Sequence, residues 1–156
     1  MENERGLIID GRAISRERRM ALRTDIKELA DQGIIPGLDV ILVGDSGPSQ
    51  VYVRNKEKAC ERLGIRSRLH SFSASTPQET LEGLIEDLNS DDSVDGILLQ
   101  LPLPGHLDAV GALAKIDPAR DVDGQHVVNM GLLFAGHPGL RPCTPAGCMA
   151  LLDAIS

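Results

Sequence analysis

Aromatic side chains are scarce in this sequence, which has one tyrosine, two phenylalanines and no tryptophan among 156 residues. A buried core must therefore be built from aliphatic side chains. Proteins that bind single-stranded nucleic acid stack its bases on several aromatic rings, so the composition excludes such a platform. The scarcity also draws attention to Tyr52, the one tyrosine of the chain.

Cysteine is scarce as well. Cys60, Cys143 and Cys148 include no pair with the spacing of a CxxC motif. This argues against a disulfide scaffold and against a zinc site, and it favours free thiols in a reducing cytosol. Long apolar runs are also missing: none approaches the ~20 residues of a membrane helix. Residues 1–5 contain no apolar signal core. We expect a soluble, cytoplasmic protein that does not bind a membrane.

The chain has no excess of positive charge, because 16 basic residues stand against 23 acidic ones, a formal net charge of −7. Such a chain is a poor partner for nucleic acid or for an anionic membrane surface. A local basic patch would still be enough to hold one small anionic ligand. The length suits a single domain, residues 1–156, with one core.

Helical and strand-like patterns alternate along the chain. The strands are predicted at residues 38–43, 65–72 and 97–101, the second of them less apolar and nearer a sheet edge. The helices are predicted at residues 15–30, 49–63, 76–89 and 107–116, with a last helix starting near 145–147. Ser49 and Thr76 are the predicted N-caps, and the chain beyond Pro118 is predicted to be irregular.

This alternation predicts an α/β fold with three layers, in which helices cover both faces of a mostly parallel sheet. Ligands of such sheets bind at the carboxyl ends of the strands, so the loops after Val43 and Leu101 are the first candidates for a site. The first of these loops, Gly44-Asp45-Ser46-Gly47-Pro48, matches neither the phosphate-loop nor the dinucleotide fingerprint. A plain connection is the simpler interpretation of it.

The segment that follows this loop carries the first candidate for catalysis. Ser49, Tyr52 and Lys56 lie at helical positions i, i+3 and i+7, on one face. Lys56 is one candidate for an acid or base that points into the cleft, and a solvated lysine beside a half-buried tyrosine is the plainer alternative. Gln100 interrupts an apolar strand just before Leu101-Pro102-Leu103-Pro104. Its amide either lies at the mouth of the cleft or is satisfied by backbone groups alone.

Two later turns offer further polar groups. Asp121 and Asp123 precede Gly124 and suit either a simple turn or a ligand contact. The histidines near them, His126 and His137, lack the tight spacing of metal ligands, so no metal is expected. Cys143-Thr144-Pro145 reads either as a helix start or as part of the cleft wall, and no base lies near Cys143 in sequence to activate it as a nucleophile.

Taken in order, these segments resemble the bifunctional methylenetetrahydrofolate dehydrogenase/methenyltetrahydrofolate cyclohydrolase family. The resemblance spans nearly all of the chain. It rests on the following stretches: Ile9-Asp10-Gly11; Ser49-Gln50-Val51-Tyr52-Val53 with Lys56 and Cys60; Asp95-Gly96-Ile97-Leu98-Leu99-Gln100-Leu101-Pro102-Leu103-Pro104; Asp121-Val122-Asp123-Gly124; and Arg141-Pro142-Cys143-Thr144-Pro145.

The resemblance implies the substrate domain of that family, which is similar to those of amino-acid dehydrogenases. It implies Lys56 as the central catalytic residue, Gln100 as the group that positions it, and Tyr52 beside them in the folate site. Asp123 would bind the donor edge of the pterin, and Ser49 and Pro102 would line the substrate. The implied reactions belong to one-carbon metabolism and purine biosynthesis: NADP-dependent oxidation of 5,10-methylene-tetrahydrofolate, and hydrolysis of the methenyl product to 10-formyl-tetrahydrofolate.

The sequence departs from the family pattern in three ways. Ala146 stands where a lysine or arginine is usual, and Gln125-His126-Val127 replaces the usual apolar-His-Pro. The family's second domain, a Rossmann domain that binds NADP through a glycine-rich turn, has no counterpart here. The resemblance therefore implies a homodimeric oxidoreductase and hydrolase for the whole enzyme, and no NADP binding by this domain alone. A folate-binding module without turnover and a substrate domain for another small molecule are the alternatives.

Overall fold

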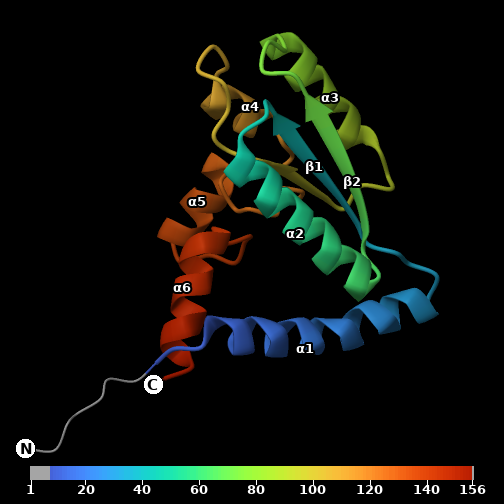
Figure 1. Cartoon of the computed structure of the whole chain (residues 1–156), viewed down its shortest axis with the longest axis vertical. Coiled ribbons are helices and arrows are strands. Elements are labelled where there is room, and N and C mark those ends of the chain that lie inside the picture. The colour runs from blue at the N-terminus through green and yellow to red at the C-terminus, as the bar shows by residue number, and fades with distance from the viewer. Residues whose placement is uncertain (1–7, 156) are drawn as a thin grey trace, which may run out of the picture.

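The computed structural model describes residues 8–155, so the charged residues 1–5 lie outside the described part. The elements follow one another as α1 (Gly11–Asp31), β1 (Gly37–Val43), α2 (Gly47–Leu63), β2 (Arg66–Phe72), α3 (Gln78–Ser90), β3 (Gly96–Leu99), α4 (Ala109–Lys115), α5 (Val127–Phe134) and α6 (Cys143–Asp153) (Figure 1). Between residues 8 and 155, no helix has the length and apolar character needed to cross a membrane.

The three strands form a parallel sheet in the order β2-β1-β3. On one face, Ile41 of β1 packs in a core that includes Ile85 of α3 and Ala112 of α4. On the other face, Val40 of β1 packs with Val53 of α2. The alternation of β1 side chains between two helical layers confirms the predicted three-layer α/β fold, with β2 at the predicted edge.

A buried carboxylate interrupts the apolar strand β1. Asp39 is fully buried, and its carboxylate contacts three cationic or ionisable groups of the edge strand β2. The distances are 3.3 Å to Arg66 Nη1, 2.9 Å to Arg68 Nε and 2.7 Å to His70 Nε2. Because alternate residues of a strand share one face, these three side chains reach the same carboxylate.

Several helix starts differ from the prediction: α1 begins at Gly11, after the cap Asp10, and α6 begins at Cys143, while two predicted N-caps have other roles. Ser49 is not an N-cap: α2 begins two residues earlier, after Ser46, and Ser49 is buried within its first turn. Pro48 lies in that first turn, where its fixed φ suits a helix and its missing N–H costs no helical bond. Pro77, not Thr76, occupies the N-cap position of α3, and Thr76 is buried instead. Ser49 and Thr76 thus lie at or beside the starts of these helices, as predicted, but neither of them is the N-cap.

The segment after Pro118 is more regular than predicted, because it contains α5. The apolar sequence of α5 carries a glycine and two adjacent valines, which are weak helix formers. Side-chain contacts compensate: His126 Nδ1 accepts a hydrogen bond from the Val128 N–H, and buried Asn129 donates to Asp121 Oδ2 at 2.9 Å. Tertiary contacts thus select the helix. In Figure 1, α6 lies between α5 and the start of α1, and α1 runs across one end of α2.

Candidate functional site

The site is built around a contact between Lys56 and Gln100. Lys56 lies half-buried on α2, and Gln100 directly follows β3. The Gln100 amide nitrogen donates to the carbonyl of Leu101 at 2.8 Å, and its backbone N–H donates to the carbonyl of Ile41 at 2.9 Å. The remaining amide oxygen accepts from Lys56 Nζ at 3.4 Å. Gln100 therefore links the lysine amine to the carboxyl end of the sheet.

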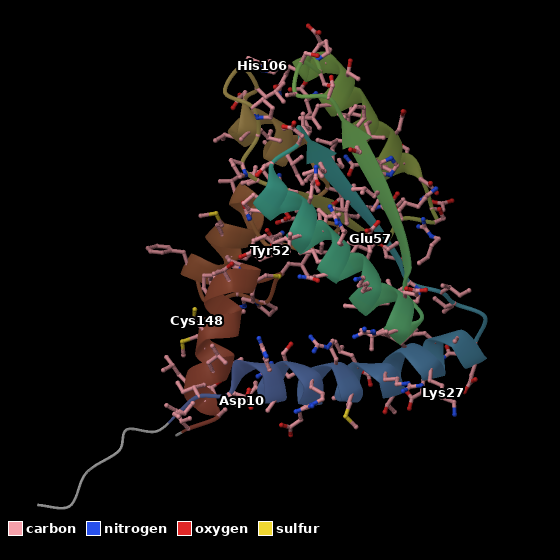
Figure 2. The ribbon with its side chains drawn as sticks, in the orientation of Figure 1. Asp10, Lys27, Tyr52, Glu57, His106 and Cys148 are labelled. Atoms are coloured by element: carbon pink, nitrogen blue, oxygen red, sulfur yellow. The ribbon has the colours of Figure 1, made fainter. Side chains whose placement is uncertain are left out.

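Tyr52 lies on α2 one turn before Lys56, and 63% of it is exposed (Figure 2). Ser49, one turn earlier again, is buried. The spacing i, i+3 and i+7 keeps Ser49, Tyr52 and Lys56 on one face of α2. Ser49 is the buried residue of this face, and Lys56 is half-buried. A phenol ring left open to solvent beside an amine is available to a ligand.

The two carboxylates of the Asp121-Val122-Asp123-Gly124 turn have different surroundings. Asp121 is buried, and its Oδ2 accepts from the His126 N–H at 2.8 Å and from Asn129 Nδ2 at 2.9 Å. It therefore holds the turn in place. Asp123 is only half-buried, and its Oδ2 accepts from Gln125 Nε2 at 2.5 Å. Of the two carboxylates, Asp123 is therefore the more accessible.

Gly124 lets the Cys143 segment pack directly on this turn. Its φ is +67°, and a Cβ there would lie 2.3 Å from the carbonyl carbon of Arg141. Only glycine permits both the left-handed backbone and the close approach. The Cys143 N–H then donates to the Asp123 carbonyl at 3.2 Å, and the Cys143 thiol donates to the Val122 carbonyl at 3.2 Å.

The pKa of the Cys143 thiol depends on the charged groups around it. Burial and then the negative charge of Asp123 raise its pKa, while the positive charge of Lys56 acts in the opposite direction. One thiol thus lies within the influence of both the lysine and the carboxylate. Lys56 and Asp123, which are far apart in the sequence, are thus both near Cys143 in the fold, and Lys56 also contacts Gln100.

Sequence reasoning missed part of this arrangement. Gln125 was noted as unusual, but its bond to Asp123 was not foreseen, and Cys143 had no predicted partner. The signal was the polar Gln125 where the family has an apolar residue. Pro102 is exposed on the loop two residues after Gln100. The ligand contacts of Ser49, Tyr52 and Pro102 stay predictions.

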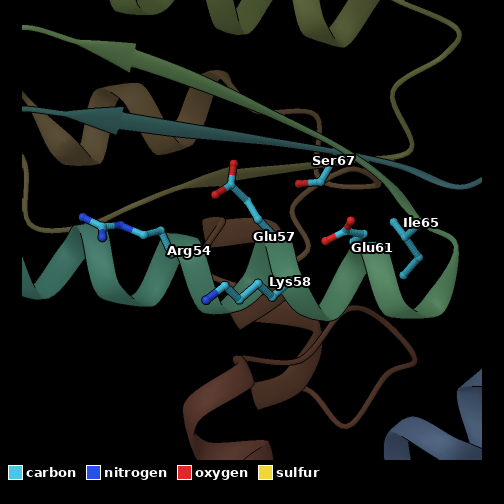
Figure 3. A pocket seen from close by; sticks show the side chains of 6 residues that line it. All are labelled: Arg54, Glu57, Lys58, Glu61, Ile65 and Ser67. Carbon is cyan, nitrogen blue, oxygen red and sulfur yellow. The ribbon is translucent and has the colours of Figure 1, made fainter.

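A hollow next to α2 lies apart from the Lys56–Gln100 site. It has a volume of about 440 Å³ and lies between α2 and the start of β2 (Figure 3). At 3.6 residues per turn, its lining residue Arg54 is about 200° around the helix from Lys56. Its walls mix both signs of charge: Arg54, Glu57, Lys58, Glu61, Ile65 and Ser67. Across residues 8–155, no three His, Cys, Asp or Glu side chains are grouped so that they could hold a metal ion.

Fold and site together define an α/β domain in which polar side chains gather near the carboxyl end of a parallel sheet. A family model described as the tetrahydrofolate dehydrogenase/cyclohydrolase catalytic domain matches residues 9–123. The chain belongs to this family.

The relatives extend the match beyond those residues. The bifunctional protein FolD of Oleidesulfovibrio alaskensis is 55% identical over 148 residues, which cover 94% of this chain and 52% of that protein. The FolD crystal structure from Campylobacter jejuni is 45% identical with a TM-score of 0.92, and covers 96% of this chain and 53% of that one. A Trypanosoma brucei FolD structure, complexed with NADP cofactor and inhibitor, is 37% identical with a TM-score of 0.92, covering 96% of this chain and 52% of that one. The chain spans about half the length of the curated relatives it matches.

Proposed function

We propose that this chain is the folate-binding catalytic domain of an enzyme that oxidises 5,10-methylene-tetrahydrofolate with NADP and hydrolyses 5,10-methenyl-tetrahydrofolate to 10-formyl-tetrahydrofolate. One observation carries the proposal: Gln100 holds the amine of Lys56 at the carboxyl end of β3, at an Nζ–Oε1 distance of 3.4 Å. Family membership supplies the substrate class. The polar groups of the cleft supply chemistry that suits it.

Hydrolysis is the reaction that these residues explain most directly. The oxygen of a water molecule forms a bond to the methenyl carbon of the cationic substrate, and the bond from that carbon to N5 breaks. Of the two protons of the water, one passes to N5 and the other leaves. Lys56 Nζ is the group that moves this proton, because it is the half-buried amine of the cleft. Gln100 acts through Lys56: its amide oxygen fixes where the amine points.

Asp123 suits the pterin end of the substrate. The pterin ring presents an amino group and a ring N–H side by side, and a carboxylate accepts from both with two parallel hydrogen bonds. Gln125 donates to Asp123 Oδ2 and so restrains the carboxylate. In this proposal, the exposed ring of Tyr52 covers the substrate, and Ser49 and Pro102 line the cleft on either side of Lys56 and Gln100.

The described residues do not fit NADP. In residues 8–155, the turn between β1 and α2 joins a strand to a helix and contains glycine. A dinucleotide phosphate would be expected at a turn of this kind. Pro48 removes one backbone N–H from its first turn, and Asp45 adds a negative charge. We therefore assign the oxidation to a longer enzyme of the length of the relatives, and only the folate contacts to this chain.

The decisive experiment follows the hydrolysis of 5,10-methenyl-tetrahydrofolate by its loss of absorbance. We expect the chain to hydrolyse it weakly, and Lys56→Ala to lower that enzymatic rate by at least about 10²-fold, the usual contribution of a positioned acid or base. Lys27→Ala, on the exposed surface of α1, is the matched control. A wild-type chain that binds reduced folate without accelerating the hydrolysis would be a binding module. A Lys56→Ala variant as fast as an active wild type would show that Lys56 is not the catalytic group, and either result would contradict the proposal.

A further inference from the structure

Gln125 carries a hydrogen-bond acceptor that no group in residues 8–155 uses. Its amide nitrogen donates to Asp123 Oδ2 at 2.5 Å, and this is the one hydrogen bond of its side chain within the described residues. A carboxylate attracts an N–H and repels an oxygen, so the contact fixes which end of the amide binds Asp123. The amide oxygen, Oε1, is the end that is left over.

The shape of the turn holds this oxygen next to the carboxylate. Gly124 lies between Asp123 and Gln125 with a φ of +67°, and its left-handed backbone lets the side chains on either side of it meet. Both side chains are half-buried, so a ligand can reach them in a partly dry place. A hydrogen bond made there is worth more than one made in open water.

The neighbouring backbone acceptors are already in use. The carbonyl of Val122 accepts from the Cys143 thiol, and the carbonyl of Asp123 accepts from the Cys143 N–H, both at 3.2 Å. The two oxygens of the Asp123 carboxylate keep room for further N–H groups, because a carboxylate has about four acceptor positions. The turn therefore offers a ligand three side-chain oxygens: Oδ1 and Oδ2 of Asp123, and Oε1 of Gln125.

The donor edge of a pterin has a matching number of hydrogens. Its amino group carries two N–H hydrogens, and the neighbouring ring nitrogen carries one. A carboxylate takes the ring N–H and one amino hydrogen through two parallel hydrogen bonds. The second amino hydrogen is then left over, and a polar hydrogen that loses its water without gaining an acceptor weakens binding.

We propose that Gln125 contacts the substrate directly: its amide oxygen accepts the second hydrogen of the pterin amino group, beside the Asp123 carboxylate. The inference rests on the proposed function, in which Asp123 binds this edge of the pterin. It makes Gln125 a residue that selects for the amino group. The apolar residue that is usual at this position of the family offers no acceptor, so the contact belongs to this chain.

Gln100 shows the complete form of this arrangement in the same domain. Its amide nitrogen donates to the carbonyl of Leu101 at 2.8 Å, and its amide oxygen accepts from Lys56 Nζ at 3.4 Å. An amide whose nitrogen is held by the protein thus presents its oxygen to a nitrogen donor. Gln125 has the first half of this arrangement, and the substrate supplies the donor of the second half.

Calorimetry and NMR test the contact with the 156-residue chain and 5-formyl-tetrahydrofolate labelled with ¹⁵N at its pterin amino group. In the wild-type complex, we expect two separate proton signals from the amino group, both shifted downfield because both hydrogens are bonded. This spectrum needs no variant. A single averaged amino signal would mean that the second hydrogen is not held, and would overturn the inference.

Gln125→Met assigns the second hydrogen to its acceptor, because methionine keeps the length of the side chain and removes the amide. We expect the Kd to rise about fivefold, the usual worth of one hydrogen bond, and one of the two amino signals to move upfield. Gln32→Met, at the exposed end of α1, is the matched control and should change neither. The urea midpoint of Gln125→Met should stay within about 0.5 M of wild type, which keeps weaker binding distinct from unfolding.

The outcomes separate this inference from the proposed function. If Gln125→Met binds the folate as tightly as wild type, the contact is wrong while folate binding stands. If it binds more weakly and both amino signals stay in place, Gln125 acts only by restraining Asp123, which also overturns the inference. If wild type does not bind the folate, the proposed function fails first and the contact with it.

Discussion

The buried carboxylate of Asp39 gives a prediction whose size follows from its surroundings. Asp39→Ala removes a fully buried charge and its contacts with Arg66, Arg68 and His70. Removing one partner of a buried ion pair costs about 3–5 kcal/mol when the partner left behind is buried too. Here the side chains left behind are partly exposed, by 29% for Arg66 and 43% for Arg68.

The two arginines also keep other acceptors in the variant. Arg66 donates to the Ser93 carbonyl, and Arg68 pairs with Asp91 at 2.9 Å. We therefore expect Asp39→Ala to lower the free energy of unfolding by about 2–3 kcal/mol, between the values for exposed and buried pairs. With a urea m-value of about 2 kcal/mol/M, the midpoint should fall by about 1–1.5 M.

Urea unfolding followed by circular dichroism measures this change. Asp25→Ala, an exposed carboxylate on α1, is the control and should shift the midpoint by less than about 0.3 M. A midpoint for Asp39→Ala as close to wild type as that of the control would refute the reasoning. It would mean that desolvation of Asp39 cancels the attraction of its three partners.

Three further expectations concern single residues. Gly124→Ala should lower the unfolding free energy by more than about 2 kcal/mol, because φ is +67° and a Cβ would collide with Arg141; a midpoint like that of wild type in urea would contradict this. Burial and Asp123 raise the Cys143 pKa above its ordinary 9.0, so iodoacetamide should label Cys143 slowly at pH 7.5 and faster in Asp123→Asn, as peptide mass spectrometry will show. Hydrogen bonds from the hydroxyl and N–H of Ser93, and then from Arg68, lower the pKa of Asp91. The difference in urea midpoint between wild type and Asp91→Asn should therefore be complete above about pH 4.5 and shrink as the pH falls below about 3.9. A difference that stays constant down to pH 2.5 would contradict this.

The layers of the fold could be predicted because each strand and helix carries its own pattern. Residues 38–43 read as a buried strand from their β-branched run, and the structure has β1 there. α5 could not be predicted in this way, since its local sequence favours no helix and its stability depends on the contact between Asn129 and Asp121. Such a contact is visible only once the chain is folded.

The candidate site, too, was predictable where local sequence patterns mark its residues and unpredictable where it depends on contacts in the folded chain. Lys56 and Gln100 were found from local patterns: Lys56 shares one helix face with Ser49 and Tyr52, and Gln100 interrupts an apolar strand. Their contact joins residues 44 positions apart, and local patterns do not encode such distances. The charge in β1 was a comparable signal: Asp39 in an apolar strand, with Arg66, Arg68 and His70 alternating along the next one, indicates a buried ion-pair cluster.

The central claim is that Gln100 acts through Lys56, and a double-mutant cycle on methenyl-tetrahydrofolate hydrolysis tests it most directly. The cycle compares wild type, Lys56→Ala, Gln100→Ala and the double variant at saturating substrate. We expect Gln100→Ala to lower kcat about tenfold in the wild-type background and by less than about twofold once Lys56 is gone, because the amide then has no amine to position. Rate losses that simply multiply in the double variant would show that Gln100 and Lys56 act independently, and would contradict the account.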